Sequence, residues 1–223
     1  MALSALYFNK SFNCREELNN VPKNTRENIL NAFLNLAMEH PKKTNFTMRE
    51  IAKRAHVSRQ AIYQKHFKNP REIVLYLRQL IDADLHQAYK EYHSAQQTMN
   101  PFVLVANTII PVFYKKRKLV RCFYITSIDP TWESFMVDVC LEWALPRVAT
   151  RSEAFNLSDE DLLKLLVNSI MSIIKIWISR ENPAPPEVFK DDFLKLVRTP
   201  LFDYLAMDPA RLTGTPPLPG RRT

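Results

Sequence analysis

Apolar residues recur three or four positions apart along most of this chain, and short polar stretches divide the apolar runs into segments. This spacing places the apolar side chains on one face of an α-helix. The first segment begins at Thr25 and ends at His40, which a proline follows. The same pattern predicts a short helix over about residues 48–55, a third helix after Ser58, and a long fourth helix over about residues 70–95. The apolar face of the first segment comprises Ile29, Ala32, Phe33, Leu36 and Ala37.

Further apolar segments follow the long helix and extend the pattern to the last part of the chain. Glycine occurs only at Gly214 and Gly220, and hairpins, bulges and phosphate-cradling loops need residues that tolerate positive φ. The sequence therefore predicts an all-α fold without a P-loop or dinucleotide-binding motif. Pro111 is expected to kink its segment, because proline removes a backbone donor. The expected segments are residues 101–114, 118–127, 130–148, a Ser158-capped helix to about 180, and 185–207.

Three helix-start signals lie between residues 47 and 70 and separate this region into short helices. The stretch "TMRE" is a capping box, in which Thr47 and Glu50 satisfy each other's first-turn amides. "HVS" predicts a turn, in which Val57 plugs the core and Ser58 caps the next helix, and Asn69 before a proline begins the long helix. A helix, a three-residue turn and a second helix, with small alanines at the crossing, predict a helix-turn-helix.

Positive charge gathers in the same part of the chain. Residues 1–75 contain 13 Lys and Arg against 6 Asp and Glu, so they hold almost all of the net charge of +8. A concentrated positive field attracts polyanions, most commonly nucleic acid, although an anionic membrane surface or a merely solubilising surface fits too. "KKRK" at residues 115–118 is interpreted as a solvated loop, with contact to DNA or an anionic effector as the alternative.

The second helix of a helix-turn-helix lies in the major groove and leads with its N-terminal residues. Arg59 suits guanine and Gln60 suits adenine, because each offers two matched hydrogen-bonding groups. Neighbouring polar side chains suit the phosphate backbone, which sets register rather than sequence. The predicted DNA-binding residues are Thr47, Arg49, Ser58, Arg59, Gln60, Tyr63, Gln64, Lys65, His66 and Lys68.

The stretch "FTMREIAKRAHVSRQAIYQKHFKNPREIVLYL" at residues 46–77 resembles the DNA-binding region of the tetracycline-repressor (TetR) family of bacterial transcriptional regulators. His56 replaces the family's usual turn glycine, so the turn either avoids positive φ or strains to hold it. Pro70 replaces the usual lysine, so that phosphate contact passes to Lys68 or Arg71. One extra residue separates Tyr63 from Phe67, which leaves the late groove-facing positions open. The matching positions are Thr47, Ile51, Ala52, Val57, Ser58, Tyr63, His66, Phe67 and Asn69.

The resemblance implies a homodimeric, all-helical regulator, expected to be a repressor, that binds a double-stranded DNA operator. No cofactor is predicted. An N-terminal arm (residues 1–23) precedes a helix-turn-helix domain (24–70). A long helix joins that domain to a helical effector-binding and dimerisation domain (71–207), and a tail expected to be disordered follows (208–223). A small molecule of unknown identity is expected to bind this second domain and to change operator affinity.

Aromatic residues between Phe102 and Trp143 are numerous enough to line an apolar cavity, although filling the core is the alternative for each of them. The helix around Trp177 is apolar on more than one side, which favours pairing with a second copy. The predicted effector pocket comprises Phe102, Phe113, Phe123, Trp132, Phe135, Met136 and Trp143. The predicted dimer interface comprises Ile173, Trp177, Leu194, Val197 and Leu201.

Other classes of function have weaker support in the sequence. Three widely spaced cysteines and the lack of a leader or a long apolar run predict a cytoplasmic protein that does not enter a membrane. No catalytic or metal-binding residues are predicted. His86 and His93 lie on one face of the long helix, with Asp82 one turn earlier. No further ligand converges on them from another segment, so a metal site is not predicted. Two alternatives stay open: a helical interaction protein without specific DNA binding, and a helical enzyme using Glu133, Asp138, Glu142 and His86.

Overall fold

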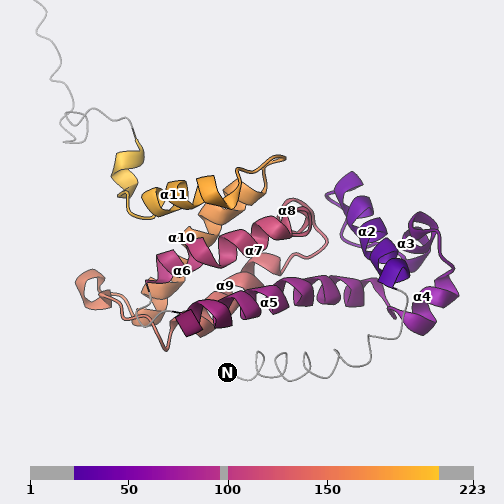
Figure 1. Ribbon diagram of the computed structural model, residues 1–223, viewed down its shortest axis with the longest axis horizontal. Helices are drawn as coiled ribbons and strands as arrows, with labels where there is room; N and C mark the ends of the chain where they lie inside the picture. The colour runs from indigo at the N-terminus through magenta and orange to yellow at the C-terminus, as the bar shows by residue number, and fades with distance from the viewer. Residues whose placement is uncertain (1–22, 96–99, 206–223) are drawn as a thin grey trace, which may run out of the picture.

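The computed structural model describes residues 23–95 and 100–205, and all regular structure in these ranges is helical (Figure 1). The prediction of an all-α fold is confirmed. Helices α2 (Lys23–Glu39), α3 (Met48–Ala55) and α4 (Arg59–Lys65) gather at one end of the molecule. The long helix α5 (Pro70–Ala95) starts beside them and runs along the remaining helices, as the pattern predicted.

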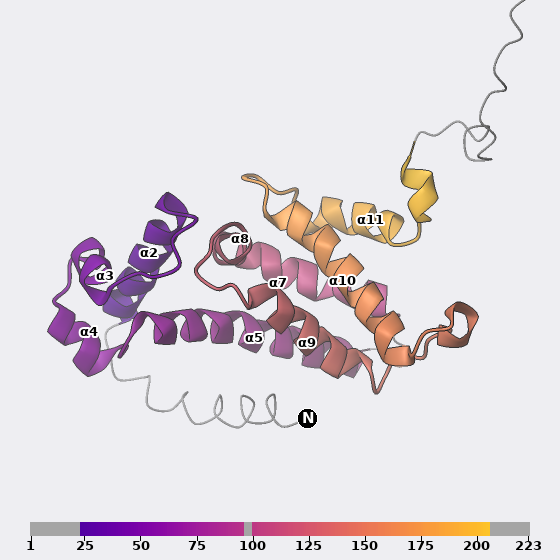
Figure 2. The same ribbon diagram turned by 180° about the vertical axis from the view of Figure 1, so that it is seen from behind.

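The second part of the molecule is a bundle packed on α5 (Figures 1 and 2). Helix α10 packs against α9, α8 and α7, and α11 packs against α6 and α7. The bundle consists of α6 (Pro101–Asn107), α7 (Ile109–Lys115), α8 (Arg117–Ile125), α9 (Trp132–Ala144), α10 (Asp159–Ile178) and α11 (Pro186–Leu196), with 3-10 turns η2 (Ser152–Phe155) and η3 (Leu201–Tyr204).

The predicted caps begin the predicted helices. The Ser58 hydroxyl accepts a hydrogen bond from the Ala61 amide at 3.1 Å, and the Ser158 hydroxyl accepts one from the Asp161 amide at 3.0 Å. The Asn69 side-chain oxygen accepts from the Glu72 amide at 2.9 Å. Each contact satisfies an amide that has no partner inside the helix. Local sequence therefore determines where these helices start.

Two of the later segments differ from the prediction because of proline. The segment at residues 101–114 is two helices, α6 and α7, which meet at Thr108. Pro111 has no amide hydrogen to donate to the Asn107 carbonyl and its ring crowds that carbonyl, so the expected kink is a break. The segment at residues 185–207 ends as an α-helix at Leu196, because Pro200 disfavours helical backbone before it.

Apolar contacts continue from the N-terminal helices into the bundle. Ile51 and Ile62 are fully buried between α2, α3 and α4, and Trp132 and Trp177 lie at the centre of the bundle. Ile73, Leu77 and Ile81 on α5 are buried too, so α5 belongs to both cores. The predicted domain division at residue 70 thus falls at the start of a helix that packs on both sides of it and stays a prediction.

Several predictions lie outside the residues that the structure describes. These are the N-terminal arm up to residue 22, the tail at residues 208–223, and Cys14. The side chain of His93 is also outside the described set.

Candidate nucleic-acid interface

The turn between α3 and α4 is closed by backbone hydrogen bonds around a left-handed residue. His56 has φ 56° and ψ 40°, and its amide donates to the Lys53 carbonyl at 3.4 Å. The Val57 amide donates to the Ala52 carbonyl at 3.1 Å. This pair of bonds is the Schellman arrangement, which usually has glycine at the left-handed position. Of the two possibilities that the sequence left open, the turn holds positive φ and pays about 1 kcal/mol of strain.

The start of α3 is held by a capping box that a lysine reinforces. The Thr47 amide donates to a Glu50 carboxylate oxygen at 2.8 Å, and the Glu50 amide donates to the Thr47 hydroxyl at 3.2 Å. The Lys43 ammonium also donates to the Glu50 carboxylate. The hydrogen bond from Lys43, followed by those from Thr47, lowers the pKa of Glu50 from 4.5 to about 2. The hydroxyl of Thr47, a predicted DNA contact, is exposed but is already used by the cap.

Helix α4 presents a polar surface on the side away from the core. Ile62 is its only fully buried side chain. Successive residues of an α-helix are 100° apart, so Gln60 and Gln64 lie nearly opposite Ile62. Tyr63, which is 48% exposed, lies beside them. Arg59 and Lys65 are exposed at the two edges of this face. The face can therefore offer two amides at its centre and one cation at each side.

The extra residue between Tyr63 and Phe67 is accommodated where α4 ends. The Ile62 carbonyl accepts hydrogen bonds from both the His66 amide, at 2.9 Å, and the Phe67 amide, at 3.0 Å. Such a wide turn takes in one more residue than an ordinary α-helical turn. Because the helix is regular up to Lys65, the extra residue does not rotate Tyr63 or Gln64 on α4. The alignment with the family pattern that starts at the turn therefore keeps Tyr63 at its helical position, whereas an alignment that starts at Phe67 would shift it.

His66 is half-buried rather than displayed on the outer face. Its ring lies 6.5 Å from that of Phe67, which packs edge-on against Tyr76 of α5 with a ring separation of 5.6 Å. Burial lowers the pKa of His66, and the charges of Arg26 and Lys65 add to this effect. The imidazole is therefore mainly neutral at pH 7 and contributes less positive charge to the surface than the sequence implies.

The remaining predicted DNA-binding residues lie at the same end of the molecule. Arg49 is exposed on the first turn of α3, and Ser58 is exposed at the start of α4. Lys68 is exposed between α4 and α5, where its amide donates to the Glu72 carboxylate at 2.6 Å, and Arg71 follows on α5. The structure thus brings the predicted residues to one end, around α3 and α4, with most of them exposed.

Comparison with known proteins identifies this region. The family model described as "Bacterial regulatory proteins, tetR family" matches residues 44–77, which contain α3, the turn, α4 and the start of α5. Residues 44–77 therefore match the DNA-binding region of TetR-family transcriptional regulators. The family's members are DNA-binding proteins and not enzymes, so the predicted helix-turn-helix is assigned to DNA binding.

Most of the chain is similar in fold to a solved structure. The crystal structure of a TetR transcriptional regulator from Streptococcus agalactiae 2603V matches with a TM-score of 0.51 and 17% sequence identity. The match covers 78% of this chain and 93% of that one, so it includes a large part of the helical bundle. At this identity the likeness concerns the fold alone. Comparison with curated protein sequences gave no significant match.

The predicted effector-pocket residues include two aromatic groups in the bundle. Phe123 stacks on Trp132 with 4.5 Å between ring centroids, and Phe135 lies 6.1 Å from Trp132. Trp143 packs edge-on against Tyr89 of α5 at 5.3 Å. Met136 and Phe113 are buried too, and Phe102 is half-buried. These side chains fill the core in this structure. Two hollows of the described surface lie elsewhere, one beside the end of α11 and one between α2 and the α3–α4 turn.

The predicted dimer residues separate into buried and accessible ones. Trp177 is 1% exposed, stacks on Phe189 at 4.3 Å and donates its indole N–H to the Ala184 carbonyl at 2.8 Å. It therefore closes the core of its own protomer, which corrects its assignment to the interface. Ile173, Leu194 and Val197 are half-buried, and Leu201 is 79% exposed.

The side chains considered for other chemistry do not converge. Among residues 23–95 and 100–205, no three His, Cys, Asp or Glu side chains are close enough to hold a metal ion. The Glu133 carboxylate is paired with Lys175 of α10. Within "KKRK", Lys116 is paired with Asp84 of α5 at 3.1 Å, and Arg117 lies over the Tyr114 ring. No helix in the described part of the chain is long and apolar enough to cross a membrane.

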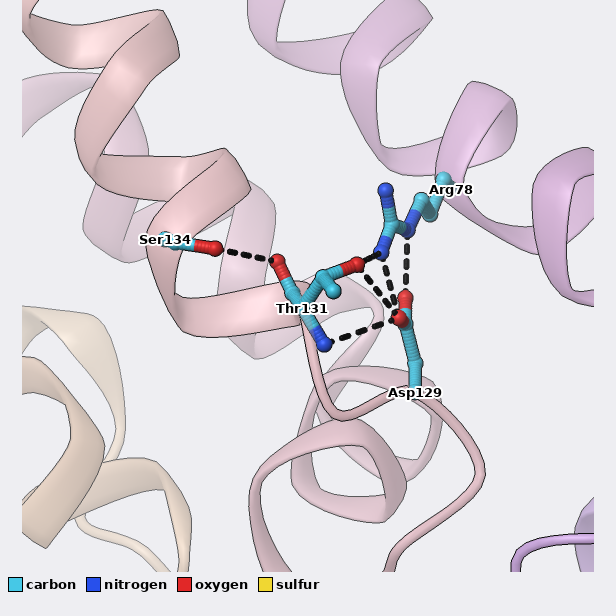
Figure 3. Close-up of polar contacts among 4 residues, drawn as sticks. All are labelled: Arg78, Asp129, Thr131 and Ser134. Atoms are coloured by element: carbon cyan, nitrogen blue, oxygen red, sulfur yellow. Dashed lines mark hydrogen bonds and ion pairs between the residues drawn. The ribbon is translucent and has the colours of Figure 1, made fainter.

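Sequence reasoning missed the contacts that join the DNA-binding helices to the bundle. Arg78 of α5 forms a two-pronged ion pair with Asp129 of the α8–α9 loop (Figure 3). In the same loop, the Ser127 amide donates to the Pro41 carbonyl at 2.7 Å. The partners are dozens of residues apart in the chain, so no local spacing signals these contacts.

Proposed function

We propose that this TetR-family protein is a sequence-specific regulator, and that the outer face of α4 reads its operator. The observation that carries the proposal is the polar face of α4 directly after a capped and closed turn. Gln60 and Gln64 occupy its centre, where a helix in the major groove brings side chains nearest to the base edges. Glutamine can bond both N6 and N7 of adenine, and Arg59 at the leading edge suits guanine.

The exposed cations around this face suit phosphate contacts. Lys65 ends α4, and Arg49 on α3, Lys68 before α5 and Arg71 on α5 lie on the neighbouring segments. Such contacts release counterions and make affinity fall steeply with salt, without regard to sequence. Substitutions on the α4 face should therefore change base preference, whereas substitutions of the surrounding cations should change affinity for all sequences.

Selection of duplex DNA from a random pool, followed by titration of the selected sequence across a salt series, tests this proposal. We expect Gln60→Ala and Arg59→Ala to relax base preference, each at a cost of about 1–3 kcal/mol for the selected site. Lys65→Ala should weaken all sequences alike and reduce the salt slope by about 1. Lys164→Ala, an exposed lysine on α10, is the control and should change neither. Binding without any sequence preference at low salt would contradict the proposal.

We further propose that a small apolar molecule controls operator affinity by binding at the aromatic group around Trp132. Phe123 lies on α8, and Trp132 and Phe135 lie on α9, which contacts α5 where Arg78 lies over the Phe135 ring. Because these rings fill the space between them, the molecule has to open the group, and so it must prefer one arrangement of α8 and α9 over another. In the same DNA titration, such a molecule changes affinity for the selected site together with Trp fluorescence. Compounds that alter fluorescence but never affinity would count against control.

A homodimer formed through α10 and α11 completes the proposal. Ile176 on α10 and Val188 on α11 are 65% and 56% exposed, although both are apolar. Leu165 on α10 is 56% exposed as well. Covering this face with the same face of a second copy is the economical solution in a symmetric dimer, and it gives two recognition helices for two half-sites.

A further inference from the structure

The helix-turn-helix is attached to the bundle at two places. The first is α5, which continues directly from the helix-turn-helix into the bundle. The second is the region around the end of α8. There the Cys122 thiol lies 4.0 Å from the Leu34 carbonyl of α2, and the Ser127 amide donates to the Pro41 carbonyl at 2.7 Å. A helix-turn-helix attached only through α5 can change its orientation relative to the bundle. A second attachment restricts this motion.

The loop that makes the second attachment is itself locked to α5. The guanidinium of Arg78 donates two hydrogen bonds to Asp129, and its Nη2 also donates to the Thr131 hydroxyl at 2.6 Å. Asp129 additionally accepts from the Thr131 amide at 3.3 Å and from the Thr131 hydroxyl at 3.1 Å. Figure 3 shows these groups converging from α5 and from the loop before α9.

The lock is shielded from water and therefore stiff. The side chains of Arg78 and Asp129 are 13% and 6% exposed, and the guanidinium lies 4.7 Å from the centre of the Phe135 ring. A buried, two-pronged pair of an arginine and a carboxylate fixes direction as well as distance. An exposed pair between flexible side chains has little such effect.

The Pro41–Ser127 hydrogen bond, the Arg78–Asp129 ion pair and helix α5 join three regions of the fold in a triangle. Its corners are the α2–α3 region at Pro41, the first third of α5 at Arg78, and the α8–α9 loop from Ser127 to Asp129. Arg78 lies eight residues into α5, about 12 Å along the axis from its start. A triangle with one side made of a continuous helix cannot shear without breaking a contact.

We infer that the α8–α9 loop (residues 126–131) is a strut that sets the orientation of the recognition helix, and that Arg78 and Asp129 are its positioning residues. Neither side chain belongs to the α4 face proposed to read DNA. In a dimer, the orientation of each helix-turn-helix determines the distance between the two recognition helices. The strut therefore determines which half-site spacing is accepted, and it leaves base preference within a half-site unchanged. This inference about spacing rests on the proposed operator binding.

The test separates positioning from stability by its choice of variants. Removing one partner leaves a buried unpaired charge and destabilises the fold, but replacing a buried pair by apolar residues of similar size is often neutral. The variant is therefore Arg78→Met with Asp129→Leu. The matched control is Lys116→Met with Asp84→Leu, because that ion pair also holds α5 to the bundle but does not involve the strut.

The DNA measurement is affinity for the selected operator with one base pair added or removed between the half-sites. We expect the intact protein to lose about tenfold or more on either change, and the strut variant to lose less than about twofold. Base preference within each half-site should be the same for both proteins, and the control should behave like the intact protein. Equal spacing preference in the strut variant and the intact protein would overturn the inference.

A second measurement does not depend on DNA. Spin labels on unnatural amino acids at the exposed positions Lys53 of α3 and Lys164 of α10 report the distance between the two parts of one chain. The labelled chain is mixed with excess unlabelled chain, so that each dimer carries one labelled copy. We expect the distance distribution of the strut variant to be at least twice as wide as that of the control. Equal widths would overturn the strut, whereas failure of the intact protein to select DNA would overturn only the proposed function.

Discussion

At the scale of single residues, His56 shows how a local rule can be overridden. Its left-handed backbone suits glycine, since a Cβ atom crowds the following carbonyl there. The position is nevertheless held by two turn hydrogen bonds, and Val57 beside it is packed against the core. The geometry of the turn, rather than the identity of the residue, is what the start of α4 requires.

We expect His56→Gly to raise the free energy of unfolding by about 1 kcal/mol, because the left-handed strain is removed while the turn is kept. Urea unfolding followed by circular dichroism measures the change. Lys53→Gly at an exposed position within α3 is the control and should lower the free energy by about the same amount, since glycine there only adds backbone entropy to the unfolded state. A loss of stability in His56→Gly would show that the histidine side chain has a role of its own.

At the scale of elements, the helix starts are set by side chains close in the chain, and α3 is the clearest case. Thr47 and Glu50 satisfy each other's amides, and Lys43 adds a third contact. Helix ends depend on more than local spacing. Pro111 and Pro200 terminate helices that hydrophobic periodicity alone extends, and the end of α4 takes in an extra residue through a wide turn.

The cap of α3 predicts a pH dependence of stability. The pKa of Glu50 is about 2 in the folded protein and 4.5 in its ordinary state. Its contribution is therefore complete above pH 4.5 and is lost as the pH falls from about 4.5 to about 2. Glu50→Gln keeps a hydrogen-bonding side chain but loses the charge, so it should be less stable than the intact protein at pH 7 and equally stable near pH 2. Thermal unfolding of both proteins between pH 7 and pH 2 measures this difference in stability.

Glu27→Gln is the control for that series, because Glu27 is an exposed acid on α2 outside the cap. The difference between it and the intact protein should vary little over the same range. If the gap between Glu50→Gln and the intact protein stays constant down to pH 2, the carboxylate of Glu50 does not carry the pH dependence.

At the scale of the whole molecule, the proposed DNA-binding surface and the proposed dimer surface lie in different parts of the chain. Residues 1–75, which include the helix-turn-helix, hold almost all of the net positive charge, and α10 and α11 carry exposed apolar residues on the bundle. Helix α5 and the α8–α9 strut connect the two parts. Under the proposed function, the protein reads DNA with one end, pairs with a second copy through the other, and passes changes in the bundle to the DNA-binding end through two attachments.

We expect Ile176→Asp to convert a dimer into a monomer, because it places a charge on the exposed apolar face of α10 that the second copy would bury. Light scattering coupled to size-exclusion chromatography measures the mass. Phe155→Asp is the matched control, since Phe155 has the same 65% exposure but lies in η2, away from that face. A monomeric intact protein, or equal effects of the two substitutions, would contradict the proposed interface.

The sequence by itself determined the all-α fold, the caps of α3, α4, α5 and α10, and the TetR-like helix-turn-helix. These depend on side chains a few residues apart, such as Thr47 with Glu50, whose spacing already defines their contact. The tertiary structure decided what depends on distant partners. It buried Trp177 inside its own protomer, packed Trp132 against Phe123, and joined Arg78 to Asp129. Periodicity shows that a face is apolar, but only packing determines whether that face meets the core, a ligand or a second copy.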